Sequence, residues 1–206
     1  EKTLYPMGDA ANLQGRVIGT NITRGNSEEY PGAVITGICK IFDMVAGSTG
    51  ISEKHARKTG IDYETVIHVA PDKPTFMPEA APVIIKIIAE KSSGKLLGVQ
   101  ALGTGDVAKR LATAATAIHA NFTIKDMVNL DLPYAPPFSP AIDNYITAIH
   151  CMENKLNGEL NSISSAALKE QLDQGEKPFL LDVRSPTEFE QLQLGLGETL
   201  IPLGAL

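Results

Sequence analysis

Two apolar stretches joined by a short turn constrain the fold of this 206-residue chain more than any other feature. Residues 83–90 and 95–102 flank a Lys-Ser-Ser-Gly turn at residues 91–94, a pattern that predicts a β-hairpin. Both arms carry apolar residues on both faces. We therefore expect the hairpin to lie centrally in a sheet that is covered on each side.

Two further stretches predict strands. Residues 33–44 are β-branched and apolar on both faces, as in a strand covered on both sides. Cys39 falls within this run and is predicted to be a buried, inert thiol, because no nearby cation would lower its pKa. Residues 63–69 alternate weakly and predict another strand, which leads into a proline-rich loop around Phe76.

Capping residues and apolar stripes predict several helices before residue 157. They are residues 9–24; residues 53–58, between a Ser52 cap and Gly60; residues 107–120, after an Asp106 cap; a short helix capped by Thr123; and a helix that begins at Ser139-Pro140 and carries an apolar stripe to Leu156.

A proline-rich loop at residues 130–140 (Leu-Asp-Leu-Pro-Tyr-Ala-Pro-Pro-Phe-Ser-Pro) separates the last two of these helices. Its prolines fix the backbone, so the loop loses little further entropy when it meets a ligand. It contains Tyr134 and Phe138. One interpretation is a rigid connector whose aromatic rings cap the core, and the other is a contact surface for a partner or substrate.

The first predicted helix opens directly after Gly8 and Asp9. A helix N-terminus in this setting can receive an anion or the electron-rich edge of a cofactor, and simple capping is the alternative.

Charge and cysteine content exclude several functional classes. The net charge of −6, with no basic run, argues against a nucleic-acid partner. No apolar run is long enough to cross a bilayer and there is no signal peptide, so we expect no membrane partner. Cys39 and Cys151 lack a CxxC spacing, and the histidines lack metal-ligand spacing. These features predict a cytoplasmic protein without a disulfide framework or metal site.

After Asn157-Gly158 the predicted elements change to short helices and strands in alternation, and we expect a domain boundary there. Residues 166–172 predict a helix and residues 178–183 a short strand, and Ser-Pro-Thr-Glu at residues 185–188 is a capping box that starts another helix. The chain opens without methionine and ends at Leu206 after an apolar run. We therefore expect a piece of a longer protein.

Several segments in order resemble the C-terminal part of the FAD-dependent pyridine nucleotide-disulfide oxidoreductases. The nearest branch is coenzyme A-disulfide reductase and its NADH oxidase relatives, in the form fused to a rhodanese domain. The segments are residues 11–16 (Ala-Asn-Leu-Gln-Gly-Arg), 48–54 (Ser-Thr-Gly-Ile-Ser-Glu-Lys) with Ala56 and Arg57, 93–100 (Ser-Gly-Lys-Leu-Leu-Gly-Val-Gln) and 130–139; residues 181–186 (Leu-Asp-Val-Arg-Ser-Pro) with Glu188 and Phe189 are similar to the start of a rhodanese domain.

The resemblance implies an α+β fold. A mostly antiparallel sheet with helices, the dimerisation domain of disulfide reductases, would be followed by an incomplete α/β rhodanese-like segment. Residues 1–25 would end an FAD-binding domain and link it onward, residues 26–156 would form the dimerisation domain, and residues 157–206 the truncated rhodanese-like segment. The implied protein is a homodimer that binds FAD and NAD(P)H in domains preceding this chain.

The resemblance also implies that this fragment is inactive alone, with no catalytic residue and no cofactor bound, because the redox cysteine belongs to the missing domains. Tyr134, Phe138 and Phe76 would contact a thiol or disulfide substrate. The tyrosine of the matching motif reaches from one subunit into its partner's active site in coenzyme A-disulfide reductases.

Four residues at the start of the first helix correspond to the flavin-facing helix of the family: Gly8, Asp9, Ala11 and Asn12. Helix amides there would stabilise negative charge at the flavin's pyrimidine edge. This sequence merges two family elements that are normally separate, so the role of Asp9 stays open.

Two departures bear on the substrate. Phe76-Met77-Pro78 stands where related enzymes carry a tyrosine pair, so a different disulfide, persulfide or polysulfide substrate is compatible with the sequence. Residues 191–198 replace a glycine-histidine-isoleucine segment of rhodaneses, and the sulfurtransferase cysteine would lie beyond Leu206. The alternative function is a non-catalytic dimeric binding module that retains the fold without cofactor domains.

Overall fold

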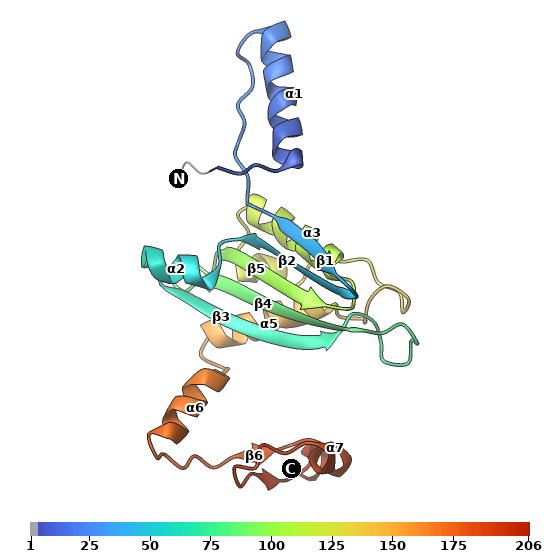
Figure 1. Ribbon diagram of the computed structural model, residues 1–206, viewed down its shortest axis with the longest axis vertical. Helices are drawn as coiled ribbons and strands as arrows, with labels where there is room; N and C mark the ends of the chain where they lie inside the picture. The colour runs from blue at the N-terminus through green and yellow to red at the C-terminus, as the bar shows by residue number, and fades with distance from the viewer. Residues whose placement is uncertain (1–3) are drawn as a thin grey trace. The chain divides into compact units, whose positions relative to one another are not determined.

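The computed structural model describes residues 4–206, which divide into two compact units, one ending at Leu160 and one spanning Asn161–Leu206 (Figure 1). None of the helices in this described part is long and apolar enough to cross a membrane. The elements of the first unit are α1 (Gly8–Arg24), β1 (Gly37–Ile41), β2 (Met44–Gly50), α2 (Glu53–Thr59), β3 (Tyr63–Pro71), β4 (Pro82–Glu90), β5 (Leu96–Gly103), α3 (Val107–His119), α4 (Ile124–Met127) and α5 (Asn144–Leu156).

The first unit is built on a five-stranded sheet in the order β1-β2-β5-β4-β3, in which all neighbours are antiparallel. The predicted hairpin is confirmed as β4 and β5, and it occupies the middle of the sheet. Gly94 takes a φ of 68° in its turn, a conformation that favours glycine. The predicted α+β fold with a mostly antiparallel sheet is therefore confirmed.

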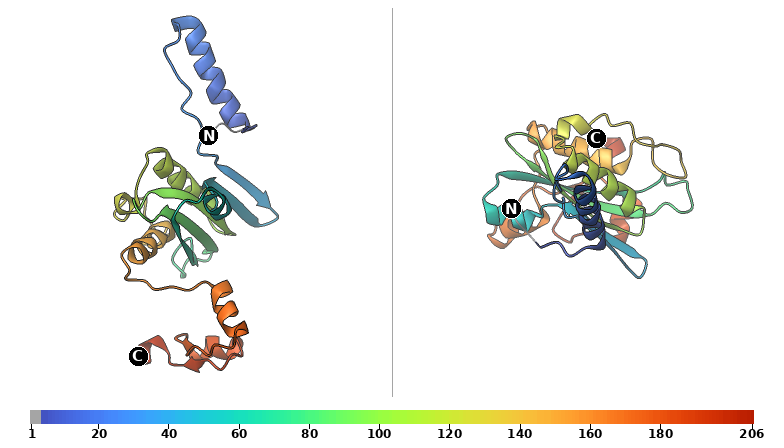
Figure 2. Two further views of the ribbon diagram at one scale, coloured as in Figure 1. Left: turned by 90° about the vertical axis from the view of Figure 1, so that its left-hand side faces the viewer. Right: turned by 90° about the horizontal axis from the view of Figure 1, so that it is seen from above.

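Helices α3 and α5 pack on one face of this sheet (Figure 2). The core between them is apolar: Ile85 and Ile87 of β4 are fully buried, as are Ala114 of α3 and Ile149 and Met152 of α5. Burial of this face supplies the main apolar stabilisation of the unit.

The opposite face of the sheet is exposed over much of its area, so the prediction that the sheet is covered on both sides is wrong for the described residues. Val69, Ile84 and Leu102 pair across β3, β4 and β5 in one row and are 59%, 38% and 39% exposed. One end of this face is closed, where Ala56 of α2 is buried and Glu53 of α2 forms an ion pair with Lys86 of β4.

Residues 33–44 do not form one strand, contrary to the prediction. Phe42, in the left-handed region with a φ of 53°, turns the chain with Asp43 between β1 and β2. β1 thereby becomes an edge strand, and Cys39 on it is exposed. The prediction that this thiol is buried is therefore wrong.

The predicted caps are local and mostly confirmed. The N-caps of α2, α3 and α4 are Ser52, Asp106 and Thr123. The last helix of the unit does not start at Ser139, as predicted. It starts at Asn144, because the carboxylate of Asp143 accepts from the Tyr145 amide at 2.9 Å and serves as the N-cap.

The second unit contains α6 (Ser165–Asp173), β6 (Leu181–Asp182), α7 (Pro186–Gln191), β7 (Thr199–Leu200) and a 3₁₀ turn, η1 (Leu203–Ala205). The predicted capping box is confirmed: Ser185 caps α7, and the Glu188 side chain accepts from the Ser185 amide. β6 and β7 form a two-stranded parallel pair, and β6 is shorter than the strand predicted at residues 178–183.

Candidate functional site

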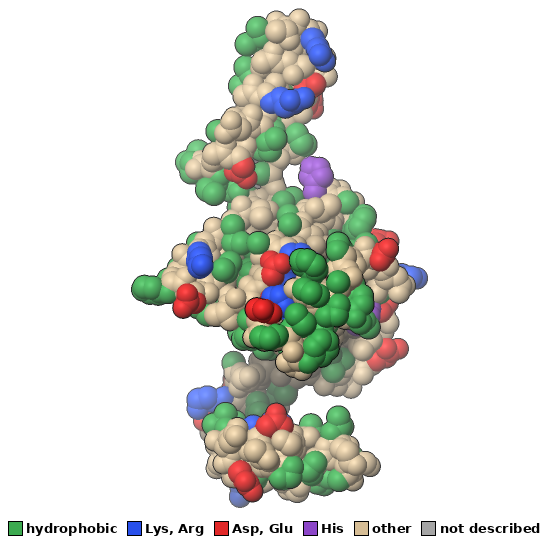
Figure 3. Space-filling model, turned by 90° about the vertical axis from the view of Figure 1, so that its right-hand side faces the viewer, with side chains coloured by type: hydrophobic (Ala, Val, Ile, Leu, Met, Phe, Trp, Pro, Cys, Tyr) green, Lys and Arg blue, Asp and Glu red, His purple; other side chains and the backbone are tan. Residues whose placement is uncertain are grey.

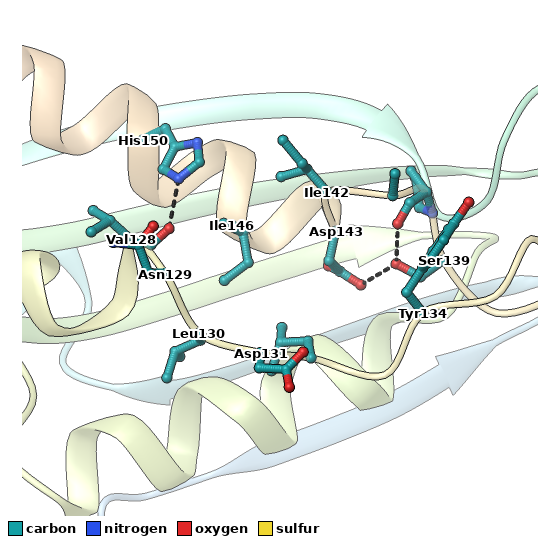
Figure 4. Close-up of a pocket in the computed structure, with 13 residues that line it drawn as sticks. Val128, Asn129, Leu130, Asp131, Tyr134, Ser139, Ile142, Asp143, Ile146 and His150 are labelled. Atoms are coloured by element: carbon teal, nitrogen blue, oxygen red, sulfur yellow. Dashed lines mark hydrogen bonds between the residues drawn. The ribbon is translucent and has the colours of Figure 1, made fainter.

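The proline-rich loop forms one wall of a pocket of about 460 Å³ whose other wall is the first half of α5 (Figure 4). Tyr134 lies at this pocket and is 56% exposed. The remaining lining residues are 128–132, 139–143, Ile146 and His150. A half-exposed phenol beside a hollow can both contact a bound molecule and donate a hydrogen bond to it.

Both ends of the loop are tied to α5. At the start, His150 Nε2 lies 2.8 Å from the carbonyl oxygen of Val128. At the end, Ser139 Oγ donates to Asp143 Oδ2 at 3.1 Å, and the Ser139 amide donates to the carbonyl of Ala135 at 3.0 Å. Tyr134 is therefore carried by a segment that is fixed at both ends as well as stiffened by proline.

The two predicted phenylalanines do not line the Tyr134 pocket. Phe76 is 75% exposed and lines a second hollow of about 510 Å³, formed by the end of β3 and residues 75–82. Phe138 is 66% exposed and lines neither hollow. The Phe76 loop, between β3 and β4, and the proline-rich loop, between α4 and α5, extend on the same side of the first unit (Figure 1), where apolar side chains gather on the surface (Figure 3).

A buried ion cluster lies beneath these loops. The Arg110 side chain has no exposed area, and its Nη2 donates to Asp143 Oδ2 at 2.8 Å. Asp72 is also buried, and its carboxylate accepts from the Ala81 amide at 2.9 Å and the Asp106 amide at 2.9 Å. Such groups are stable in the interior only when their hydrogen-bonding capacity is satisfied.

The carboxyl groups of this cluster are held ionised. Burial alone would raise the pKa of Asp143, but the Tyr145 amide and two neighbouring cations outweigh it, so the pKa lies below its ordinary value. The pKa of Asp72 is lowered in the same way, against the effect of burial, by two backbone amides and Lys73.

The predicted cofactor-facing residues lie at the start of α1. Gly8 opens the helix after Met7, whose side chain makes no capping bond. Asp9 Oδ1 accepts from the Ala10 amide at 2.8 Å, and Asn12 Nδ2 donates to the Gly8 carbonyl at 2.6 Å. Gly8, Asp9, Ala11 and Asn12 are all exposed, and only Asp9 borders the hollow of about 460 Å³ between α1 and residues 28–36.

Within residues 4–206, no group of three or more His, Cys, Asp or Glu side chains could hold a metal ion. The sequence interpretation missed two residues of the site. Arg110 lies three residues after Val107 and four before Ala114, on the apolar face of α3, and this spacing is the local signal that it points inward. His150, which carries no motif in the sequence, also lines the Tyr134 pocket.

Comparison with known proteins gives the site a family context. The chain is 40% identical over 146 residues to the NAD(P)H sulfur oxidoreductase (CoA-dependent) of Pyrococcus furiosus, a match covering 71% of this chain and 33% of that protein. It is 38% identical over 141 residues to the NAD(P)H coenzyme A polysulfide/persulfide reductase of Pyrococcus horikoshii, covering 68% and 31%. The chain thus spans about a third of the length of these curated relatives.

Solved structures agree. The NAD-dependent persulfide reductase from A. fulgidus matches with a TM-score of 0.88 and 42% identity, over 98% of this chain and 36% of that one. Reduced Bacillus anthracis CoADR-RHD matches with a TM-score of 0.90 and 35% identity, over 99% and 36%. The family described as pyridine nucleotide-disulphide oxidoreductase, dimerisation domain, matches residues 36–146, and the chain belongs to that family.

Proposed function

We propose that this chain provides the dimerisation domain and a substrate-contacting tyrosine of an FAD- and NAD(P)H-dependent oxidoreductase. The substrate class is a disulfide, persulfide or polysulfide, with coenzyme A disulfide among the candidates. The single observation that carries the proposal is Tyr134, half-exposed at a pocket on a loop that is anchored at both ends. The names of the archaeal relatives support the sulfur chemistry.

The chemistry assigned to Tyr134 is positioning and hydrogen bonding. Its phenol would donate to a sulfur atom that gains negative charge as the sulfur–sulfur bond breaks. Phe138 and Phe76, both largely exposed, would contact the apolar part of the substrate. Exposed aromatic rings of this kind are characteristic of binding surfaces.

The start of α1 fits the edge of a flavin. Met7 supplies no side-chain cap, so the dipole of the helix can act on an electron-rich group, and Gly8, Ala11 and Asn12 would face it. The carboxylate of Asp9 accepts from the Ala10 amide and so occupies one of the first amides of its own helix. When bound, FAD supplies the electron transfer between nicotinamide and the sulfur substrate.

We further propose that the whole protein is a cytoplasmic homodimer. In it, residues 1–25 would complete the FAD-binding domain, residues 26–156 would form the dimer contact, and residues 157–206 would begin a rhodanese-like segment. The redox cysteine and the nucleotide-binding folds would come from the rest of the protein. The 206 residues alone are accordingly expected to bind neither FAD nor NAD(P)H and to be inactive.

The test is Tyr134→Phe in the full-length protein, assayed by NAD(P)H oxidation with coenzyme A disulfide and with polysulfide. We expect turnover to fall by at least about tenfold, with unchanged flavin absorbance and dimer mass. Tyr63→Phe is the matched control, because its hydroxyl donates to Glu53 at 3.1 Å, away from both loops. Unchanged turnover in Tyr134→Phe would contradict the assigned contact.

A second candidate is the non-catalytic dimeric binding module, which the loss of hydroxyl groups at Phe76-Met77 favours. The same measurements separate the two. A full-length protein with neither flavin absorbance nor NAD(P)H oxidation would support the binding module and reject the oxidoreductase.

A further inference from the structure

Arg110 is the most completely bonded buried side chain beneath the candidate site. Its Nε donates to Asp143 Oδ1 at 3.1 Å and Asn144 Oδ1 at 2.9 Å, and its Nη1 donates to the Asp106 carbonyl at 3.0 Å. Its Nη2 donates to Asp143 Oδ2 at 2.8 Å and to the Asp72 carbonyl at 3.0 Å. The planar guanidinium thus makes contacts with three separate parts of the chain.

The first of these parts, Asp143 with Asn144, directly follows the loop that carries Tyr134. Asp143, held by two Arg110 contacts, also accepts from the hydroxyl of Ser139, five residues after the tyrosine. Lys109 adds a second tie, since its Nζ lies 3.1 Å from Asp143 Oδ2 and 3.5 Å from the Phe138 carbonyl. The end of the proline-rich loop is therefore fastened to the Arg110 cluster.

The second part carries Phe76. Asp72 and Ala81 close the neck of its loop with two bonds of 2.9 Å, from the Asp72 amide to the Ala81 carbonyl and from the Ala81 amide to Asp72 Oδ1. Arg110 holds this neck through the Asp72 carbonyl. One buried side chain is therefore bonded directly to the neck of the Phe76 loop and, through Asp143, to the end of the Tyr134 loop.

We infer that Arg110 is a positioning residue that fixes the Phe76 loop and the Tyr134 loop relative to each other for substrate binding. The claim that the loops bind substrate rests on the proposed function. The claim that Arg110 fixes the two loops rests on the contacts alone. Because the guanidinium is fully buried and bonds both Asp143 and the Asp72 carbonyl, a shorter or less branched cation cannot keep all of its bonds. The two loops would then no longer be fixed relative to each other. Small misplacements of binding groups reduce substrate affinity steeply.

The main variant is Arg110→Lys in the full-length protein, which keeps the buried charge but removes the branched guanidinium group and its several donors. Two milder variants each remove one contact on one side of the cluster. Ser139→Ala breaks the tie of the Tyr134 loop to Asp143, and Lys73→Met removes the 3.0 Å ammonium contact of Asp72. Thr116→Val is the matched control, because its hydroxyl bonds only to the Ala112 carbonyl of its own helix.

Two readouts are needed, and the first is hydrogen exchange followed by mass spectrometry. Arg110→Lys should speed exchange by about fivefold or more in residues 72–81 and in residues 130–142. Ser139→Ala should affect only residues 130–142, Lys73→Met only residues 72–81, and Thr116→Val neither. Faster exchange in one loop or in none for Arg110→Lys would overturn the shared anchor. If that variant does not fold, unchanged exchange of residues 130–142 in Ser139→Ala would overturn the inference, because the Tyr134 loop would then not depend on its tie to the Arg110 cluster.

The second readout separates positioning from simple stabilisation. With polysulfide and coenzyme A as the probe, the KM of Arg110→Lys and Ser139→Ala should rise about tenfold, while flavin reduction by NADH stays within about twofold. Ser139→Thr, which keeps the hydroxyl, should restore the KM. Faster exchange in both loops with an unchanged KM would reject the substrate role of the loops, and with it the inference. A failed Tyr134→Phe test combined with a raised KM here would instead reject only the tyrosine contact.

Discussion

Asp143 combines three roles in one carboxylate: it caps α5, pairs with Arg110 and accepts from Ser139. Because its pKa is lowered in the folded state, its stabilisation is present above the unfolded pKa, near 3.8, and is lost as pH falls through the folded value. We therefore expect Asp143→Asn to lower the free energy of unfolding by about 3 kcal/mol at pH 7. The difference from the unsubstituted chain should shrink at pH 3.

Urea unfolding at pH 7, 5 and 3 measures this. Asp173→Asn is the control, since Asp173 pairs only with the exposed Lys169 in α6. A difference that stays constant from pH 7 to pH 3 would show that the ionised form of Asp143 contributes nothing.

Cys39 gives a prediction that reverses the sequence interpretation. The thiol is exposed on edge strand β1, whereas Cys151 is half-buried against the core. In this chain we expect an aromatic disulfide reagent to label one thiol quickly and the other slowly. Cys39→Ser should remove the fast phase and leave the slow one. Equal rates for the two thiols would contradict the placement of β1.

At the scale of elements, the contact between β2 and β5 depends on glycine. Gly98 pairs with Gly50 across the two strands, and a Cβ at position 98 would lie 2.0 Å from the Ile51 carbonyl oxygen. We expect Gly98→Ala to lower the free energy of unfolding by about 3 kcal/mol, because backbone must move to admit the methyl group.

Gly15→Ala in α1 provides the comparison, since a Cβ there meets no atom within 4 Å. Alanine at that helix position should be neutral or stabilise by about 1 kcal/mol. Equal effects of the two substitutions in chemical denaturation would show that the strands separate easily at Gly98.

The elements that were predicted correctly are those with local signals. Ser52, Asp106 and Thr123 act on amides within three residues, so their spacing in the sequence is sufficient to identify them. The turn at Phe42-Asp43 carries no glycine or proline, and its one turn-favouring residue, Asp43, is too weak a signal to distinguish it from a continuous strand. The exposed face of β3 and β4 was predicted to be buried because an apolar residue in a strand looks the same in the sequence whether its side chain is buried or exposed.

For the whole molecule, the same distinction explains which parts of the site were predicted. Tyr134 was identified because its proline-rich loop is contiguous in sequence and resembles a family motif. Arg110 was missed because its role depends on Asp72 and Asp143, which lie 38 and 33 residues away. Contacts of that separation depend on the topology of the sheet, and one sequence does not specify them.

The two units differ in how much core each possesses, and this leads to the last prediction. The first unit buries a cluster of apolar side chains between its sheet and two helices. In residues 161–206, all of which the structure describes, no side chain is buried. A segment that buries so little apolar surface cannot offset its loss of chain entropy and should not unfold cooperatively by itself.

We therefore expect a chain ended at Leu160 to keep the melting temperature of the 206-residue chain within about 2 °C, because the core that sets the transition is unchanged. Residues 161–206 prepared separately should show no cooperative transition by circular dichroism and should be digested rapidly by trypsin. A fall of several degrees in the shortened chain would mean that the second unit contributes to the stability of the first. A sharp transition in the separate segment would mean that its exposed strand pair and short helices suffice for folding.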